Sequence, residues 1–270
     1  MAAEQALRLG NWLGAHALGV FWALLCLLLV LVALAVWVWR GQVLRRAHAA
    51  WPEPAVLLLN VVAGFAVVIA GAAGFAEIAE QLGPGGLMSQ ADEAISASVG
   101  SHSSARTLQA FALITHLGDV AVLAPLGVAV ALWLWWRGQR TLALGWVLAL
   151  SGNALLNPML KRIFERVRPV HEVSAVSEMG WSFPSGHTSG ATVAYGMLAY
   201  VMLRTLPSGW HLPAVLGAAG LAFAVGSSRV FLQVHFVSDV VAGFASGSAW
   251  LMVCILSVAV SPGWHTARRR

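Results

Sequence analysis

Three short clusters of histidine, serine and basic residues lie between apolar runs in the second half of the 270-residue chain. The third cluster runs from Ser228-Arg229 through His235 to Asp239. His235 and Asp239 are four residues apart, so a helical path would place the carboxylate beside the imidazole. A carboxylate that holds one ring N–H leaves the other ring nitrogen free to act as a nucleophile. The same spacing also suits a structural pair that caps a helix.

The second cluster, Pro184-Ser185-Gly186-His187, opens one of the apolar runs. Pro184 prevents a helix from continuing through it and Ser185 is a favourable N-cap, so N–H groups of the first turn point outward. A helix start of this kind binds anions. Taken alone, His187 in that turn is interpreted as an interfacial histidine that bonds the loop. A serine hydrolase with Ser185 as nucleophile would lack the strand-turn-helix context of such enzymes.

The first cluster extends from Lys161 to Arg168-Pro169. Lys161 and Arg168 are seven residues apart, and a helical or near-helical path would place both on one face. A solvated basic loop beside a membrane is the alternative. Four further charged residues of this region are interpreted as loop or headgroup contacts: Arg162, Glu165, Arg166 and Glu172.

The composition decides the class of protein. Apolar residues make up 59% of the chain and charged residues only 10%, against about 25% charged residues in a soluble domain. A soluble fold of this size could not hide so much apolar side chain, so the sequence predicts a polytopic membrane protein. The two cysteines, Cys26 and Cys254, lie inside apolar runs and form no disulfide framework or zinc motif. The basic residues are spread along the chain, which argues against nucleic-acid binding.

A helix needs about 20 mostly apolar residues to cross a bilayer, and we expect an all-α bundle of about seven spans. The expected spans are 18–39, 56–76, 120–136, 141–157, 185–203, 212–227 and 240–260. Residues 91–113 mix polar and apolar side chains and are expected to lie as a helix on the membrane surface. The turn at 115–119 precedes one span, and its His116 and Asp119 either cap that span, which we favour, or line the mouth of a pocket.

Arginine placement predicts the orientation, because loops rich in arginine stay in the cytoplasm. With seven spans, one set of loops carries Arg40, Arg45, Arg46, Arg137, Arg140, Arg204 and the tail Arg268 to Arg270. The opposite side holds five cations that break the rule and need another cause: Lys161, Arg162, Arg166, Arg168 and Arg229.

Taken in order, the three clusters closely resemble the signature of the type 2 phosphatidic acid phosphatases, K-x6-RP, PSGH and SR-x5-H-x3-D, with no position missing. The superfamily includes vanadium haloperoxidases and glucose-6-phosphatase. The resemblance covers about residues 75–260. Members commonly have six spans, so the span at 18–39 is expected to be an addition. We therefore divide the chain into an N-terminal segment, 1–55, and a phosphatase-like domain, 56–270.

The resemblance also implies roles. His235 would attack phosphorus and form a phosphohistidine, with Asp239 orienting it. His187 would protonate the leaving oxygen and then assist the attacking water. The phosphoryl oxygens would be held by Lys161, Arg168, the Ser185 hydroxyl, the Gly186 N–H and Arg229. The resemblance implies no metal and no other cofactor. Phosphoryl transfer needs mostly positioning and positive charge, which also accounts for the five outward cations.

The sequence thus predicts a membrane phosphatase that hydrolyses a lipid phosphate or pyrophosphate. Candidate substrates are phosphatidic acid, phosphatidylglycerol phosphate, undecaprenyl pyrophosphate and a lipid A phosphate. The location expected is the bacterial inner membrane, with the site facing the periplasm or exterior. Alternatives are a lipid phosphotransferase using the same site, a non-catalytic phospholipid-binding protein, a transporter, and vanadate-dependent halide oxidation. The oligomeric state stays open.

Overall fold

The computed structural model of the chain describes residues 1–48, 53–83, 85–169 and 180–261, and these are helical, with turns between the helices and no strand. The α-helices are α1 (Ala2–Ala15), α2 (Ala17–His48), α3 (Glu53–Glu80), α4 (Leu87–His102), α5 (Ala105–Thr115), α6 (Val120–Trp136), α7 (Arg140–Phe164), α8 (Gly186–Thr205), α9 (His211–Phe231) and α10 (Val237–Ala259). The prediction of an all-α protein is confirmed.

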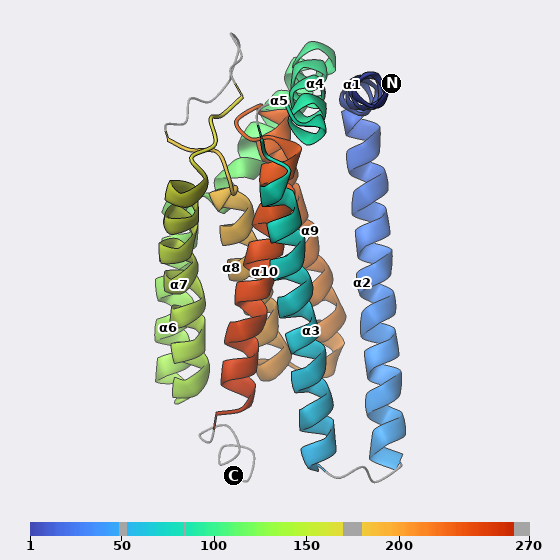
Figure 1. Cartoon of the computed structure of the whole chain (residues 1–270). Helices are drawn as coiled ribbons and strands as arrows, with labels where there is room; N and C mark the ends of the chain where they lie inside the picture. Colours follow the sequence, from blue (N-terminus) through green and yellow to red (C-terminus); the bar gives the residue numbers. More distant parts are fainter. Residues whose placement is uncertain (49–52, 84, 170–179, 262–270) are drawn as a thin grey trace.

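Seven of the helices run side by side: α2, α3, α6, α7, α8, α9 and α10 (Figure 1). In the described part of the chain, six stretches are long and apolar enough to cross a membrane: Ala17–Gly41, Leu58–Glu80, Ala105–Trp136, Arg140–Phe164, Ser208–Phe231 and Val237–Ala259. The seventh helix, α8, is more polar and buries Thr188, Ser189 and Thr192. It tolerates them because α7, α9 and α10 pack around it and separate it from lipid.

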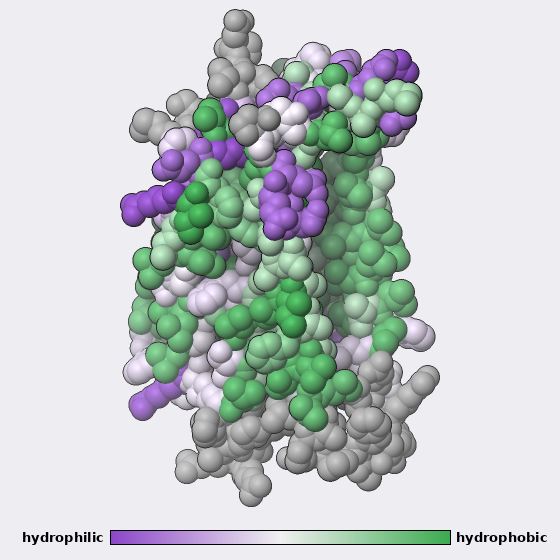
Figure 2. All heavy atoms as spheres, in the orientation of Figure 1, coloured by the Kyte–Doolittle hydropathy of each residue, from purple (hydrophilic) through white to green (hydrophobic). Residues whose placement is uncertain are grey.

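The outer surface of the bundle is apolar. On α3, large side chains such as Leu58, Val62, Phe65 and Ile69 are exposed. Figure 2 shows apolar side chains over the length of the helices on one face, with polar side chains gathered at the end that carries α1 and α4. Exposed apolar side chains on this scale are stable only in hydrocarbon. The chain is an integral membrane protein.

Helices α1 and α4 lie across the end of the bundle (Figure 1). They pack closely where α1 carries glycine: a Cβ on Gly10 would lie 2.8 Å from Cβ of Ala94, and one on Gly14 would lie 2.5 Å from Cβ of Ser98. The sequence did not predict α1. The single surface helix expected at 91–113 is two helices, α4 and α5, and Ser104 begins the second by accepting a hydrogen bond from the Thr107 amide (3.2 Å).

The other end of the bundle carries arginines next to aromatic rings. The guanidinium groups of Arg137, Arg140 and Arg204 lie 5.3–5.8 Å from the ring centroids of Trp133, Trp135 and Tyr200. Arg40, near the same end of α2, donates to the Ser208 carbonyl oxygen at 2.7 Å. This end is opposite the one that carries the three motif clusters, as the predicted separation of the arginines requires (Figure 1).

Candidate active site

His235 and Asp239 meet at the start of α10. The chain leaves α9, turns through Gln233 (φ 55°) and reaches His235 just before α10 begins. Nδ1 of His235 lies 3.3 Å from Oδ2 of Asp239, and the same oxygen accepts the Phe236 amide at 2.9 Å. Helix α10 therefore contains Asp239 but not His235. The carboxylate both caps α10 and contacts the imidazole, so the structure contains both the expected contact and the expected cap.

Arg168 fixes the proton arrangement of His235. Its Nη1 donates to the Val234 carbonyl oxygen (2.8 Å) and lies 3.1 Å from Nε2 of His235. A guanidinium group only donates, so Nε2 must be the acceptor and the ring proton is assigned to Nδ1, facing Asp239. Burial, opposed by Asp239 but reinforced by Arg168 and Arg229, lowers the pKa of His235 from 6.5 to about 4. His235 is therefore neutral at pH 7 and carries a lone pair on Nε2.

The first cluster is split between a helix and a loop. Helix α7 ends at Phe164 because Glu165 takes a left-handed conformation (φ 45°), so the expectation that Lys161 and Arg168 share a helix face is wrong. Lys161 donates from Nζ to the Trp181 carbonyl oxygen (2.9 Å), and Arg168 from Nε to that of Gly180 (3.0 Å). Both cations thus hold the segment that leads into the second cluster.

Ser185 joins the second cluster to the third. It caps α8 as predicted, accepting hydrogen bonds from the amide (3.4 Å) and the hydroxyl (2.9 Å) of Thr188. Its own amide donates to the Asp239 carbonyl oxygen at 3.0 Å. At Gly186 a Cβ would lie 2.9 Å from Oδ1 of Asn157, so this turn of α8 has no room for a side chain.

His187 belongs to a second histidine–carboxylate group. Its Nε2 lies 2.7 Å from Oδ1 of Asp119, and Oδ2 of Asp119 lies 2.7 Å from Nδ1 of His116. Asp119 stands at the N-cap position of α6, yet its side chain makes no capping hydrogen bond. The favoured interpretation of Asp119 as a cap was wrong, because the carboxylate is taken up by the two imidazoles.

Two arginines with little exposure lie beside these groups. Arg229, only 1% exposed, donates from Nη1 to the Thr115 hydroxyl at 2.6 Å. Arg166 donates from Nη1 to Oδ1 of Asp239 (2.7 Å) and from Nη2 to Oδ2 of Asp92 (2.9 Å). The interpretation of Arg166 as a loop or headgroup contact was therefore wrong. Arg162 and Glu165 are exposed, and Glu172 lies outside the described residues.

Asp92, Thr115 and Asp119 are the partners that the sequence did not assign. Their contacts with Arg166, His187 and Arg229 join residues that are 68 to 114 positions apart in the chain. The local sequence around a polar residue does not indicate which distant residue it will contact. Among the described residues, no group of three His, Cys, Asp or Glu side chains is arranged to hold a metal ion.

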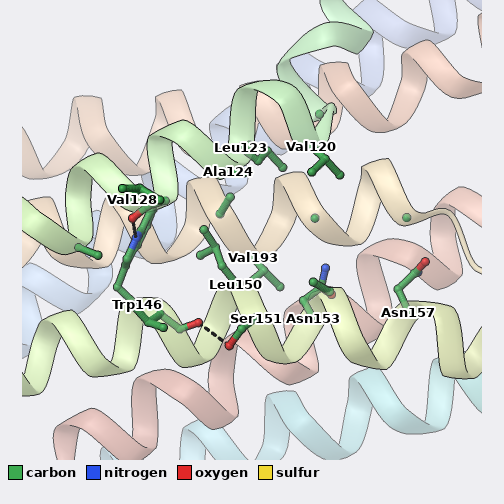
Figure 3. A pocket seen from close by; sticks show the side chains of 18 of the residues that line it. Val120, Leu123, Ala124, Val128, Trp146, Leu150, Ser151, Asn153, Asn157 and Val193 are labelled. Carbon is green, nitrogen blue, oxygen red and sulfur yellow. Dashed lines mark hydrogen bonds between the residues drawn. The ribbon is translucent and has the colours of Figure 1, made fainter.

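A largely apolar cavity of about 640 Å³ opens beside His187, between α6, α7 and α8 (Figure 3). Its walls include Leu123 and Val128 of α6 and Leu150 of α7. The lining residues of α6 run from Val120 to Leu132, which is about 18 Å at 1.5 Å per residue. Gly186 and His187 line the cavity. His235 is not among the described residues that line it.

Known proteins resemble this chain in sequence and fold. The model of the PAP2 superfamily matches residues 140–261. Phosphatidylglycerophosphatase B of Bacillus subtilis is 40% identical over 136 residues, which is 50% of this chain and 66% of that protein. Decaprenylphosphoryl-5-phosphoribose phosphatase of Mycobacterium tuberculosis is 31% identical over 131 residues, 46% of this chain and 66% of that one. The chain thus spans slightly less than two thirds of the length of these curated relatives.

A solved structure extends the match. The crystal structure of a transmembrane PAP2 type phosphatidylglycerolphosphate phosphatase from Bacillus subtilis superposes with a TM-score of 0.66 at 32% identity, covering 72% of this chain and 98% of that one. Identity at this level over nearly the whole of a neighbour establishes common descent as well as common fold. The chain belongs to the PAP2 superfamily, in its membrane-spanning branch.

Proposed function

We propose that the chain is a lipid phosphatase that hydrolyses a lipid phosphate monoester or pyrophosphate through a phosphohistidine on His235. The observation that carries the proposal is the arrangement around that ring: Asp239 on Nδ1, Arg168 on Nε2, and a pKa lowered to about 4. A neutral, oriented imidazole whose unprotonated nitrogen accepts a hydrogen bond from a guanidinium is suited to attack a phosphoryl group once the same guanidinium binds that group.

In the first step Arg168 moves its Nη1 hydrogen bond from His235 to a phosphoryl oxygen. Nε2 then attacks phosphorus in line, the P–N bond forms, and the bond from phosphorus to the leaving oxygen breaks. Lys161, Arg229, the Ser185 hydroxyl and the Gly186 N–H are assigned to the remaining phosphoryl oxygens. Asp239 stabilises the positive charge that develops on the imidazole.

His187 serves the leaving group. In the first step it donates a proton to the leaving oxygen. In the second it takes a proton from water, whose oxygen attacks phosphorus, breaks the P–N bond and releases inorganic phosphate from His235. Nε2 of His187 lies 2.7 Å from Oδ1 of Asp119, so this carboxylate orients the ring for both transfers.

The cavity supports a lipid as the leaving group. His187 lines it and His235 does not, so an apolar chain in the cavity would carry its leaving oxygen on the side of the acid and expose phosphorus to the nucleophile. Both curated relatives are named as phosphatases of phosphorylated lipids. A panel of substrates would identify the head group and the number of apolar chains of the lipid.

We further propose that the protein lies in a bacterial inner membrane with its site at the periplasmic face. The arginines at the end opposite the site support this orientation under the positive-inside rule. A reporter fused after α10 should then be active only in the cytoplasm. Reporter activity on the external side would reverse the assignment.

The function is tested with the chain purified in detergent. Phosphate release would be measured from phosphatidic acid, phosphatidylglycerol phosphate and undecaprenyl pyrophosphate, in excess EDTA, for wild type and His235→Ala. We expect release by wild type, a rank order that identifies the substrate, and a loss of at least about 10⁴-fold in the variant.

Two outcomes would contradict the proposal. Full activity of a folded His235→Ala would exclude the phosphohistidine route. Transfer of the phosphoryl group to a second lipid, with no release to water, would make the chain a phosphotransferase with the same site.

A further inference from the structure

Asp239 uses its two carboxylate oxygens for different purposes. Oδ2 accepts the Phe236 amide and faces Nδ1 of His235, whereas Oδ1 accepts Nη1 of Arg166 at 2.7 Å. A carboxylate orients an imidazole only if its own plane is fixed. Arg166 therefore sets the rotation of the group that sets the ring of His235.

Arg166 is held in turn from the interfacial helix α4. Its Nη2 donates to Oδ2 of Asp92 at 2.9 Å, and its guanidinium carbon lies 4.3 Å from the ring centroid of Phe236. Asp92 is 4% exposed. It also accepts the Ser238 amide (3.2 Å) and the Ser238 hydroxyl, so it is anchored to the first turn of α10.

Burying two carboxylates around one guanidinium costs much desolvation, and such triads are often no more stable than apolar packing. A surface helix could be attached to the bundle with fewer buried charges. The arrangement is better explained by what it fixes, which is the position of the Asp239 carboxylate.

We propose that Arg166 and Asp92 are positioning residues for the His235–Asp239 pair, and that helix α4 is thereby part of the support of the active site. The proposal rests on the phosphatase function proposed above. It extends the site to two residues outside the motif positions, one of them 147 residues before Asp239.

The first test is Asp92→Asn, which keeps the shape of the side chain and removes its charge. We expect kcat to fall about 10- to 100-fold, the range typical of residues that orient a reacting group, with KM nearly unchanged. Glu93→Gln is the matched control, since Glu93 is exposed on the same turn of α4; it should retain the activity of wild type. Equal activity of Asp92→Asn and Glu93→Gln, or a change in KM alone, would overturn the proposal.

The pH profile separates positioning from a merely structural role. The charges that face His235 are Asp239 from α10, Arg229 from α9 and Arg168 from the loop after α7. In Arg166→Gln a cation next to Asp239 is lost, so the acid limb of kcat/KM should move to higher pH. In Asp92→Asn a negative charge is lost, so the limb should not move upward. An upward shift in both variants, or in neither, contradicts the proposal.

The double variant Asp92→Asn/Arg166→Gln should be no less active than Arg166→Gln, because both residues act through one contact. Multiplying losses would indicate two independent roles. If Asp92→Asn does not purify as a folded protein, Arg166→Lys is decisive: it keeps the charge but not the fork of donors, so kcat should fall with the acid limb in place. Unchanged kcat in that variant would overturn the proposal.

Wild type and His235→Ala are measured in the same assay. An inactive wild type would overturn both proposals. An active wild type, an inactive His235→Ala and a fully active Asp92→Asn would overturn only the positioning role.

Discussion

The two histidine–aspartate pairs of this protein differ in almost every physical respect. His235 and Asp239 are four residues apart, fully buried and 3.3 Å from each other. His187 and Asp119 are 68 residues apart, partly exposed and 2.7 Å from each other, and Asp119 also holds His116. Three arginines, Arg166, Arg168 and Arg229, lie near the first pair, and His187 of the second pair lines an apolar cavity. A nucleophile gains from an environment that keeps it neutral and fixed, whereas an acid needs contact with the leaving group and with water.

The largest expected effect in the second pair is that of His187→Ala. Loss of a general acid costs about 10²- to 10⁴-fold, and the cost should depend on the leaving group. We expect a large loss with a lipid phosphate and a much smaller one with p-nitrophenyl phosphate, whose leaving group needs no proton. Rates would be measured on both substrates. A loss of equal size on both would remove His187 from the role of acid.

Asp119→Asn tests whether the second pair is a working unit. The amide keeps the shape of the side chain but loses the charge that holds His187, so kcat should fall about tenfold or more. His116→Gln is the control on the same carboxylate, because its side chain is 65% exposed; it should change kcat little. If His116→Gln were the more damaging substitution, His116 and not His187 would be the main partner of Asp119.

Narrowing the cavity should affect only substrates that carry a long lipid chain. Ala124→Leu adds volume to a wall of the cavity, and Ala129→Leu adds the same volume to an exposed position of α6 that does not line it. KM for a long-chain lipid phosphate should rise several-fold in the first variant only. A water-soluble phosphate should show no difference, and a matching rise there would place the cavity outside the path of the lipid chain.

The smallest expected change concerns mildly acidic pH. With the pKa of His235 lowered to about 4, the neutral ring persists as pH falls from 6.5 to 5, so kcat/KM should retain most of its value at pH 5. The neutral fraction of an ordinary histidine with a pKa of 6.5 would fall about 16-fold over the same interval. The profile would be recorded on two substrates whose phosphate groups differ in pKa. An acid limb that reports the substrate would shift between them, whereas one that reports His235 would not. A fixed limb near 6.5 would contradict the buried, neutral nucleophile.

The contrast between a pair that is close in sequence and a pair formed by distant segments also explains what the sequence could predict. The clusters at Lys161 to Pro169, Pro184 to His187 and Ser228 to Asp239 are local patterns, and composition alone shows that they must lie between spanning helices. The cap at Ser185 and the contact between His235 and Asp239 also follow from spacing. The end of α7 at Phe164 does not, because Glu165 in a left-handed conformation has no sequence signal as clear as glycine.

Contacts between helices that are distant in the chain could not be predicted from the sequence. Arg166 lies outside the signature, so the sequence indicates only a loop or headgroup contact for it; its partner Asp92 comes from α4. An aspartate directly before a helix indicates an N-cap, so the local sequence at Asp119 favours capping over a contact with His187. The more polar helix α8, in turn, is explained only by the neighbours that enclose it.

The position of these partners limits how far the region matched by the family model can be treated as an independent unit. The family match at 140–261 contains all three motif clusters, yet Asp92, Thr115 and Asp119 precede it. A transplanted fragment of that extent would retain the full signature and lose the residues that hold Arg166, Arg229 and His187. Engineers who recombine members of this family should therefore place a crossover before α4, not at the edge of the recognised motif region.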